Sequence, residues 1–244
     1  MKFHVLTLFP EMIEDAVKTS ITGRAIENNL ISVDAINIRD FADNEYGQID
    51  DYPYGGGAGM VMMAQPIIDA YESIKEKTDK NPRVVYLTPQ GETFNHDKAV
   101  ELSKEDELVF LCGHYEGIDE RAIEAVVTDE ISLGDFVVTG GELPALVMID
   151  AISRLVPGVL NNDDSASDES FANGLLEYPQ YTRPDTVEGE EVPEILLSGN
   201  HPKVDEWRRQ QSLKRTCERR PDLLEKADLS EADREFLDTI KDKQ

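Results

Sequence analysis

The sequence contains little cysteine. Cys112 and Cys217 are too few for a disulfide framework and lack metal-ligand spacing, which favours a reducing compartment. The four histidines form no metal-ligand pattern either, so no metal site is expected. Long apolar runs are missing as well: no stretch reaches the length of a membrane span, and Glu11 closely follows the short apolar start. We therefore expect a cytoplasmic protein that does not associate with membranes.

Positive charge is also scarce, with 24 basic against 50 acidic residues and a formal net charge of −26. Such a charge argues against a polyanionic partner unless the basic residues cluster. Residues 203–220 do form a cluster, with 7 basic and 3 acidic side chains and hence a local charge of +4. One helical face of this segment carries Arg208, Ser212, Arg215 and Arg219, and three guanidinium groups there could follow a phosphate backbone. A solvated helix of mixed charge is the alternative, and the sequence leaves both open.

Two common nucleotide-binding motifs are missing. The first apolar run ends in Phe9-Pro10-Glu11 rather than in Gly-x-Gly-x-x-Gly, which argues against a hydride-transfer enzyme. The glycine-rich segment 50–60 lacks the Gly-Lys-Ser/Thr ending of a phosphate loop, which argues against a nucleoside triphosphate site. This segment is either a flexible turn or a loop that holds a planar group or a backbone closely.

Short β-like runs alternate with helical patterns in the first two thirds of the chain. Strands are expected at residues 3–8, 84–87, 108–112 and 131–138. One helix is expected with Pro10 in its first turn and another at residues 145–156. This alternation predicts an α/β fold with a mostly parallel sheet and helices on both faces. Beyond Phe171 the pattern is helical, with a long helix at 202–220 and a capping box at Ser230 to Asp233.

Residues 161–170 are polar, acidic and without apolar periodicity, which is typical of a linker or lid. We therefore expect one domain at 1–160, an acidic flexible linker at 161–173 and a small C-terminal helical domain at 174–244.

Two glycine-edged loops follow two of the expected strands. The first is Gly113-His114-Tyr115-Glu116-Gly117, and the second runs from Gly134-Asp135 to Thr139-Gly140-Gly141. Glycine lets a backbone approach a ligand closely, and ligands of α/β proteins usually bind at the carboxyl ends of strands. The two loops therefore predict a ligand site. His114, taken by itself, is interpreted as incidental rather than catalytic.

Arg154 lies near the end of the expected apolar helix. A buried arginine there needs an anionic partner or an oxygen-rich ligand. The alternative is a side chain that extends from the helix end to solvent.

Five longer motifs occur in order along the chain. They are Asp-Tyr-Pro-Tyr-Gly-Gly-Gly-Ala-Gly-Met at 51–60, Cys-Gly-His-Tyr-Glu-Gly-Ile-Asp-Glu-Arg at 112–121, Gly-Asp-Phe-Val-Val-Thr-Gly-Gly-Glu-Leu-Pro at 134–144, Leu-Glu-Tyr-Pro-Gln-Tyr-Thr-Arg-Pro at 176–184 and Leu-Leu-Ser-Gly-Asn-His at 196–201. Together they resemble the bacterial tRNA (guanine-37-N1)-methyltransferases. The resemblance implies a SPOUT-type methyltransferase fold with a deep trefoil knot, S-adenosylmethionine as cofactor, and tRNA with guanine 37 next to the anticodon as substrate. It also implies a homodimer whose active site lies between subunits.

The resemblance further implies that three loops, at residues 86–90, 113–117 and 132–141, hold S-adenosylmethionine in a bent shape. The residues expected to contact it are Tyr86, Leu87, Pro89, Gly113, Tyr115, Glu116, Gly117, Ser132, Leu133, Gly134, Asp135, Phe136, Val137, Val138, Gly140, Gly141 and Pro144. The C-terminal domain is expected to bind tRNA.

For catalysis, the resemblance implies a general base immediately before a Ser-Phe pair and an assisting arginine on the apolar helix. The matching residues are Glu169 and Arg154. The family usually has aspartate where this chain has Glu169, and Asp168 precedes it. Either Glu169 acts as the base, or a shifted loop brings Asp168 into that place. We favour Glu169, which occupies the matching position.

Two other functions agree with parts of the sequence. A ribose 2′-O-methyltransferase of the same fold would not need to deprotonate a ring nitrogen, but the complete Tyr-Glu-Gly and Gly-Gly-Glu-Leu-Pro motifs disfavour it. A non-catalytic RNA-binding or metabolite-sensing protein gains slight support from the net charge of −26, whereas Arg154 and Glu169 oppose it.

Overall fold

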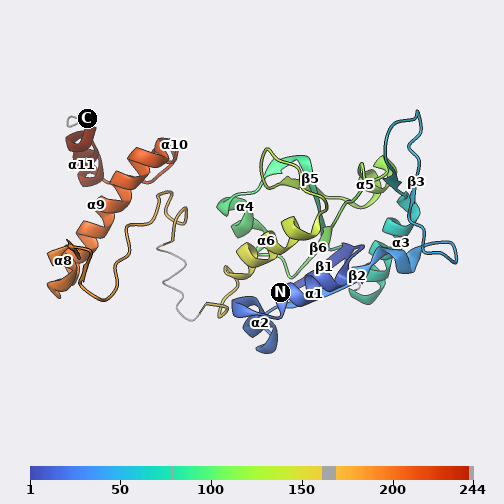
Figure 1. Cartoon of the computed structure of the whole chain (residues 1–244), viewed down its shortest axis with the longest axis horizontal. Coiled ribbons are helices and arrows are strands. Elements are labelled where there is room, and N and C mark those ends of the chain that lie inside the picture. Colours follow the sequence, from blue (N-terminus) through green and yellow to red (C-terminus); the bar gives the residue numbers. More distant parts are fainter. Residues whose placement is uncertain (79, 161–168, 242–244) are drawn as a thin grey trace. The chain divides into compact units, whose positions relative to one another are not determined.

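A five-stranded parallel sheet forms the centre of unit 1, which comprises residues 1–161 (Figure 1). The strands lie in the order β2-β1-β6-β5-β7, and each neighbouring pair is parallel. Their bounds are β1 Lys2–Thr7, β2 Ser32–Asn37, β5 Arg83–Thr93, β6 Glu107–Leu111 and β7 Asp129–Ser132. The computed structural model describes residues 1–78, 80–160 and 169–241, so Asp168 and most of the expected linker lie outside the described residues.

Helices cover both faces of this sheet and form one apolar core on each. The first core includes side chains of α1 (Pro10–Val17), α2 (Ser20–Glu27), α4 (His96–Leu102) and α6 (Glu142–Ser153); the second includes η1 (Ile38–Phe41), α3 (Ala64–Thr78) and α5 (Glu120–Val126). In β1, Val5 belongs to the first core and Leu6 to the second, because successive strand side chains point to opposite faces. The predicted α/β class with a mostly parallel sheet is confirmed, and the trefoil knot stays a prediction.

Unit 2, residues 162–244, is mainly helical. Its elements are α8 (Glu194–Leu197), α9 (His201–Arg219), α10 (Pro221–Leu224) and α11 (Glu231–Lys241), with a hairpin of β8 (Thr186–Val187) and β9 (Glu190–Glu191). Leu175, Leu213 and Leu237 form its small core. Within the described residues of both units, no helix is long and apolar enough to cross a membrane.

Several elements of unit 1 differ from the bounds expected from the sequence, and two of them flank the second glycine-edged loop. The strand expected at 131–138 ends at Ser132, because Gly134 adopts a φ of 143° and its N–H donates to Ser132 Oγ at 3.1 Å, which turns the chain. The apolar helix begins at Glu142 rather than at residue 145, and Pro144 lies in its first turn.

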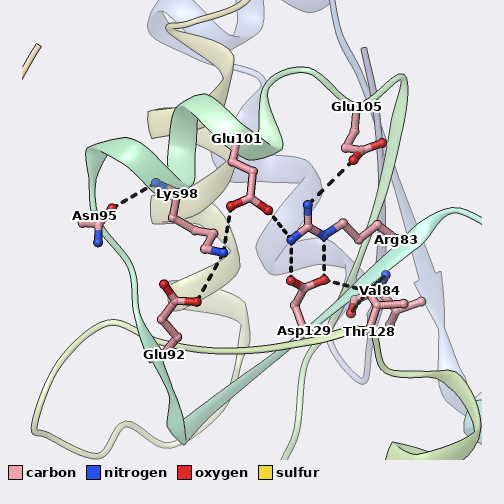
Figure 2. Close-up of polar contacts among 9 residues, drawn as sticks. All are labelled: Arg83, Val84, Glu92, Asn95, Lys98, Glu101, Glu105, Thr128 and Asp129. Atoms are coloured by element: carbon pink, nitrogen blue, oxygen red, sulfur yellow. Dashed lines mark hydrogen bonds and ion pairs between the residues drawn. The ribbon is translucent and has the colours of Figure 1, made fainter.

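A charged network ties α4 to the amino-terminal ends of β5 and β7 (Figure 2). Arg83 donates to the two carboxylate oxygens of Asp129 at 2.6 and 2.5 Å, and it also donates to Glu101 on α4. Burial alone would raise the pKa of Asp129, but hydrogen bonds from Arg83 and Thr128 lower it. The network therefore holds an ionised carboxylate where the two strands begin.

The capping box predicted before the last helix is confirmed, and an ion pair joins it. The Ser230 N–H donates to Asp233 Oδ2 at 2.9 Å, and the Asp233 N–H donates to Ser230 Oγ at 3.2 Å. Arg209 on α9 donates to the same carboxylate at 2.8 and 3.1 Å. The Arg209 hydrogen bond is the main reason that the pKa of Asp233 falls to about 2, although burial opposes it.

We predict that Asp233→Asn lowers the free energy of unfolding by about 2 kcal/mol near pH 7, because the folded protein loses a carboxylate whose pKa is depressed from 3.8 to about 2. A depressed folded pKa gives stability that is present above about pH 4 and is lost as the pH falls towards about 2. Urea denaturation followed by circular dichroism should therefore show the difference between wild type and variant shrinking over that interval. Asp238→Asn, exposed on the same helix, is the control, and equal effects of the two substitutions would contradict the prediction.

Candidate active site

A cavity of about 460 Å³ lies beside β5 and at the carboxyl ends of β6 and β7. It is lined by residues 86–90, 113–118, 130–133 and 136–141, together with Glu120, Ile123 and Pro144. All residues expected to contact the cofactor line this sheet-edge cavity except Gly134 and Asp135. Stretches far apart in the sequence meet here because neighbouring parallel strands end at a common edge.

One wall of the sheet-edge cavity comes from the middle of β5. Leu87 and Glu92 both pair with Ile131 of β7, so the intervening residues 88–91 leave the ladder and return to it within one strand. Thr88, Pro89 and Gln90 of this excursion line the cavity. The sequence predicted only the first part of β5, at 84–87, because the apolar pattern ends there.

The loop before α6 lies directly against the end of β6. The Gly141 N–H donates to the Gly113 carbonyl at 3.1 Å. A Cβ at Gly141 would stand 2.6 Å from the Cα of Cys112, and one at Gly140 would stand 2.6 Å from Glu142 Oε2. Glycine is required at both positions because there is no room for a side chain.

A buried carboxylate connects three elements next to this loop. Glu142, the first residue of α6, is 2% exposed and accepts a hydrogen bond from Thr7 Oγ1 at 2.6 Å. His114 Nε2 lies 2.8 Å from both carboxylate oxygens and lines the cavity. Because an ionised carboxylate only accepts, Nε2 carries the hydrogen. Burial raises the pKa of the adjacent Cys112 thiol, and the Glu142 charge adds to that effect.

The sequence analysis does not predict this Thr7-His114-Glu142 cluster. Thr7 and Glu142 are 135 positions apart, so no local spacing connects them. Sequence alone favours an incidental role for His114, yet its ring is held by the carboxylate and packs edge-on to the Phe9 ring, with 5.1 Å between the ring centres. The available signal was a glutamate directly after Gly140-Gly141, where a helix begins and a negative charge is favoured.

The glycine-rich segment 50–60 packs on the first glycine-edged loop. The Glu116 N–H donates to the Met60 carbonyl at 3.0 Å, and the Met62 N–H donates to the Gly117 carbonyl at 2.9 Å. A Cβ at Gly59 would collide with the Glu116 side chain, which lines the cavity. Of the two sequence interpretations, the structure therefore supports close backbone packing for the end of this segment.

The residues expected to act in catalysis belong to different units. Arg154 is the C-cap of α6 in unit 1 and is partly buried. Glu169 lies in unit 2 and lines a second cavity, of about 340 Å³, together with residues of α9. Arg154 and Glu169 both have interaction partners in the chain.

The residues expected to bind tRNA do not form one open surface. Arg208 and Ser212 line this second cavity, and Ser212 is buried. Arg215 is partly buried and donates to the Glu177 carbonyl at 3.5 Å, whereas Arg219 is exposed. This face of α9 thus contacts the preceding segment of the chain over most of its length, whereas Arg219, at the end of the helix, is exposed to solvent.

Comparison with known proteins identifies relatives over almost the whole chain. The family model described as tRNA (Guanine-1)-methyltransferase TrmD matches residues 1–226. A protein of Lachnospira eligens is 61% identical over 92% of this chain and 95% of its own length, and one of Ruminiclostridium cellulolyticum is 58% identical over 93% and 97%. A protein of Alkaliphilus oremlandii is 55% identical over 100% of both chains. All three are named tRNA (guanine-N(1)-)-methyltransferase.

We predict that Gly141→Ala lowers the free energy of unfolding by about 3 kcal/mol, because its Cβ would overlap the backbone of Cys112 and overpacking of this kind is costly. Urea denaturation of the full chain measures the change. Gly56→Ala is the control: nothing lies within 4 Å of its Cβ, so it adds only the strain of a φ of 79°, about 1 kcal/mol. Equal losses for the two variants would show that the close approach at Gly141 does not matter.

Proposed function

The chain belongs to the tRNA (guanine-1)-methyltransferase family and is an enzyme that methylates N1 of guanine in tRNA, and we propose that the target is guanine 37, next to the anticodon, with S-adenosylmethionine as methyl donor. The observation that carries this proposal is the sheet-edge cavity, because the loops that surround it are the segments that carry the family motifs. The relatives' names specify guanine N1, which favours neither the ribose methyltransferase nor the non-catalytic alternative.

The sheet-edge cavity fits the proposed cofactor. Gly140 and Gly141 keep it open where a side chain would intrude, and Leu87 and Leu133 offer apolar surface for an adenine ring. The Glu116 carboxylate suits a positively charged ammonium group. When bound, S-adenosylmethionine supplies an electrophilic methyl group on a sulfonium.

The protein's part in the reaction is to activate and place the guanine. N1 carries a proton at neutral pH, so a general base must remove it. We assign this role to Glu169, whose carboxylate takes the proton as the N1–methyl bond forms and the methyl–sulfur bond breaks. Negative charge that develops on O6 needs a fixed cation, the role the resemblance gives to Arg154. Asp168 is the alternative base and lies outside the described residues.

We propose that the C-terminal domain, residues 174–244 within unit 2, binds tRNA. The support is its local charge: residues 203–220 carry 7 basic and 3 acidic side chains in a chain of net charge −26. Arg208, Ser212, Arg215 and Arg219 are the residues expected to contact RNA there.

We also propose a homodimer in which Glu169 of one chain acts at the sheet-edge cavity of its partner. The support is an apolar surface on two helices that contact each other in unit 1, α1 and α6. Met12 on α1 is 42% exposed, and Leu143 and Val147 on α6 are 55% and 52% exposed. Exposed apolar side chains on adjoining helices are typical of an interface.

We predict that incubation with labelled S-adenosylmethionine yields 1-methylguanosine from a tRNA transcript with G37 and no methylated nucleoside at that position from one with A37. In single-turnover assays Glu169→Ala should slow the chemical step by about 100-fold or more, since general-base catalysis contributes about that much. Asp168→Ala is the matched comparison and should stay near the wild-type rate. Loss of the step in Asp168→Ala alone would reassign the base, and a methylated ribose would overturn the reaction itself.

We further predict that two inactive variants complement each other if the site lies between subunits. Mixed dimers of Arg154→Ala and Glu169→Ala contain one site with both residues intact, so remixing the two proteins should restore part of the activity. Remixing Glu169→Ala with the Arg154→Ala/Glu169→Ala double variant is the control and should restore none. Sedimentation velocity checks the dimer directly, and a monomeric wild type would contradict the proposal.

A further inference from the structure

Residues 170–177 fold into a closed turn within unit 2, which we call the 170–177 turn. The Glu177 N–H donates to Ser170 Oγ at 2.9 Å, so the two ends of the turn are joined. Inside it, the Phe171 N–H donates to the Leu175 carbonyl at 2.8 Å. Leu175 is 4% exposed and belongs to the small core of unit 2. The turn is therefore closed by hydrogen bonds and anchored by an apolar side chain.

Thr216 of α9 fixes this turn to the helix. The residue is fully buried, and its Oγ1 accepts a hydrogen bond from the Leu176 N–H at 2.9 Å. The same hydroxyl donates to the Ser212 carbonyl at 2.7 Å, so its hydrogen points away from the turn and a lone pair faces Leu176. A buried N–H is costly to leave unpaired, and a valine of the same shape could not accept from it. One hydroxyl group therefore holds the turn against α9.

The 170–177 turn contains a strained residue. Phe171 has a φ of 78°, in the left-handed region that residues with a side chain rarely adopt. The Arg220 guanidinium carbon lies 6.0 Å from the centre of the Phe171 ring, at the limit of a cation–π contact. Gly174 also has a positive φ, and a Cβ there would stand 3.2 Å from the Cα of Ala227. Strained backbone persists where the surrounding contacts over-determine it, and it is concentrated at functional sites.

Glu169 is joined directly to this turn. It precedes Ser170, and its carbonyl accepts a hydrogen bond from the Ala172 N–H at 3.2 Å. Glu169 lines the second cavity together with Ser212 of α9, the residue whose carbonyl accepts from Thr216. The backbone of Glu169 is thus placed relative to α9 by the same contacts that close the turn and fix it to the helix.

We propose that the 170–177 turn positions the general base, and that Ser170 and Thr216 are positioning residues that act through the backbone of Glu169. This inference rests on the proposed function, in which Glu169 takes the proton of guanine N1. A general base acts only within hydrogen-bond reach of that proton, and a displacement of about 1 Å can slow a reaction about 100-fold. The residues that support a reactive group therefore set its rate without contact with the substrate.

The first test measures single-turnover methylation of G37 transcripts by Thr216→Val, Thr216→Ser and Ser170→Ala. Thr216→Val and Ser170→Ala each remove the acceptor of one backbone N–H of the turn, so the chemical step should slow by about 10- to 100-fold at neutral pH. Thr216→Ser keeps the hydroxyl and should keep most of the rate. Thr239→Val, the same exchange at an exposed position of α11, is the matched control and should equal the wild type. Ser170 is only partly buried, so Ser170→Ala keeps the test decisive if Thr216→Val fails to fold.

The pH dependence separates a displaced base from a damaged fold. At alkaline pH guanine N1 loses its proton to the solvent, so the reaction depends less on the general base. The rate of Thr216→Val relative to the wild type should therefore recover as the pH rises. Loss of folded protein would not produce this recovery.

Glu169→Ala, measured in the same assay, distinguishes a failure of this inference from a failure of the proposed function. A wild-type rate in Glu169→Ala would overturn the assignment of the base, and the positioning role with it. A slow Glu169→Ala beside wild-type rates in Ser170→Ala and Thr216→Val would overturn the positioning role alone. Equal rates of Thr216→Ser and Thr216→Val, or a deficit of Thr216→Val that stays constant at all pH values, would have the same consequence.

Discussion

The buried carboxylate of Glu142 is the constraint on which the sheet-edge cavity depends. A charge that is 2% exposed must be surrounded by donors, and here they come from Thr7 at the end of β1 and His114 after β6. The start of α6 is therefore fixed to two strand ends. Gly140 leaves room for this carboxylate and the His114 ring, and Gly141 lets the loop lie against the backbone of Cys112. One ionised group thus sets the distance between the loops that line the cavity.

The opposite ends of the strands are fixed by charge as well. Arg83 at the start of β5 binds Asp129 at the start of β7, and both are tied to α4 through Glu101. The sheet thus has a polar cluster at each end of its strands, and between these clusters an apolar core is packed on each face. In unit 2, too, an ion pair holds elements together beside an apolar core: Asp233 joins α11 to α9 next to a core of few residues.

The parts of this molecule that could be read from the sequence are those with local signals. Parallel strands, the proline at the start of α1 and the Ser230-Asp233 capping box all follow from short-range spacing. The Thr7-His114-Glu142 cluster could not be read, because tertiary packing alone brings these residues together. The sequence predicts a strand as far as residue 138, since Val137 and Val138 favour strands, but Gly134 already ends the ladder.

The basic face of α9 shows a further limit. Helical spacing alone suggested a phosphate-tracking stripe, but Ser212 is buried and Arg208 lies against Tyr178. Spacing places side chains on one face of a helix and says nothing of what covers that face. The chain at 169–178 covers it here.

The excursion of β5 has a consequence for how this site can vary among related proteins. Residues 88–91 form a cavity wall that is joined to the ladder at both ends, since Leu87 and Glu92 pair with the same residue, Ile131. A residue added here would leave the pairs on either side in place, because residues 88–91 lie outside the ladder, and would lengthen the excursion beside the cavity. The length of this wall can therefore change without any change in the pairing of the sheet.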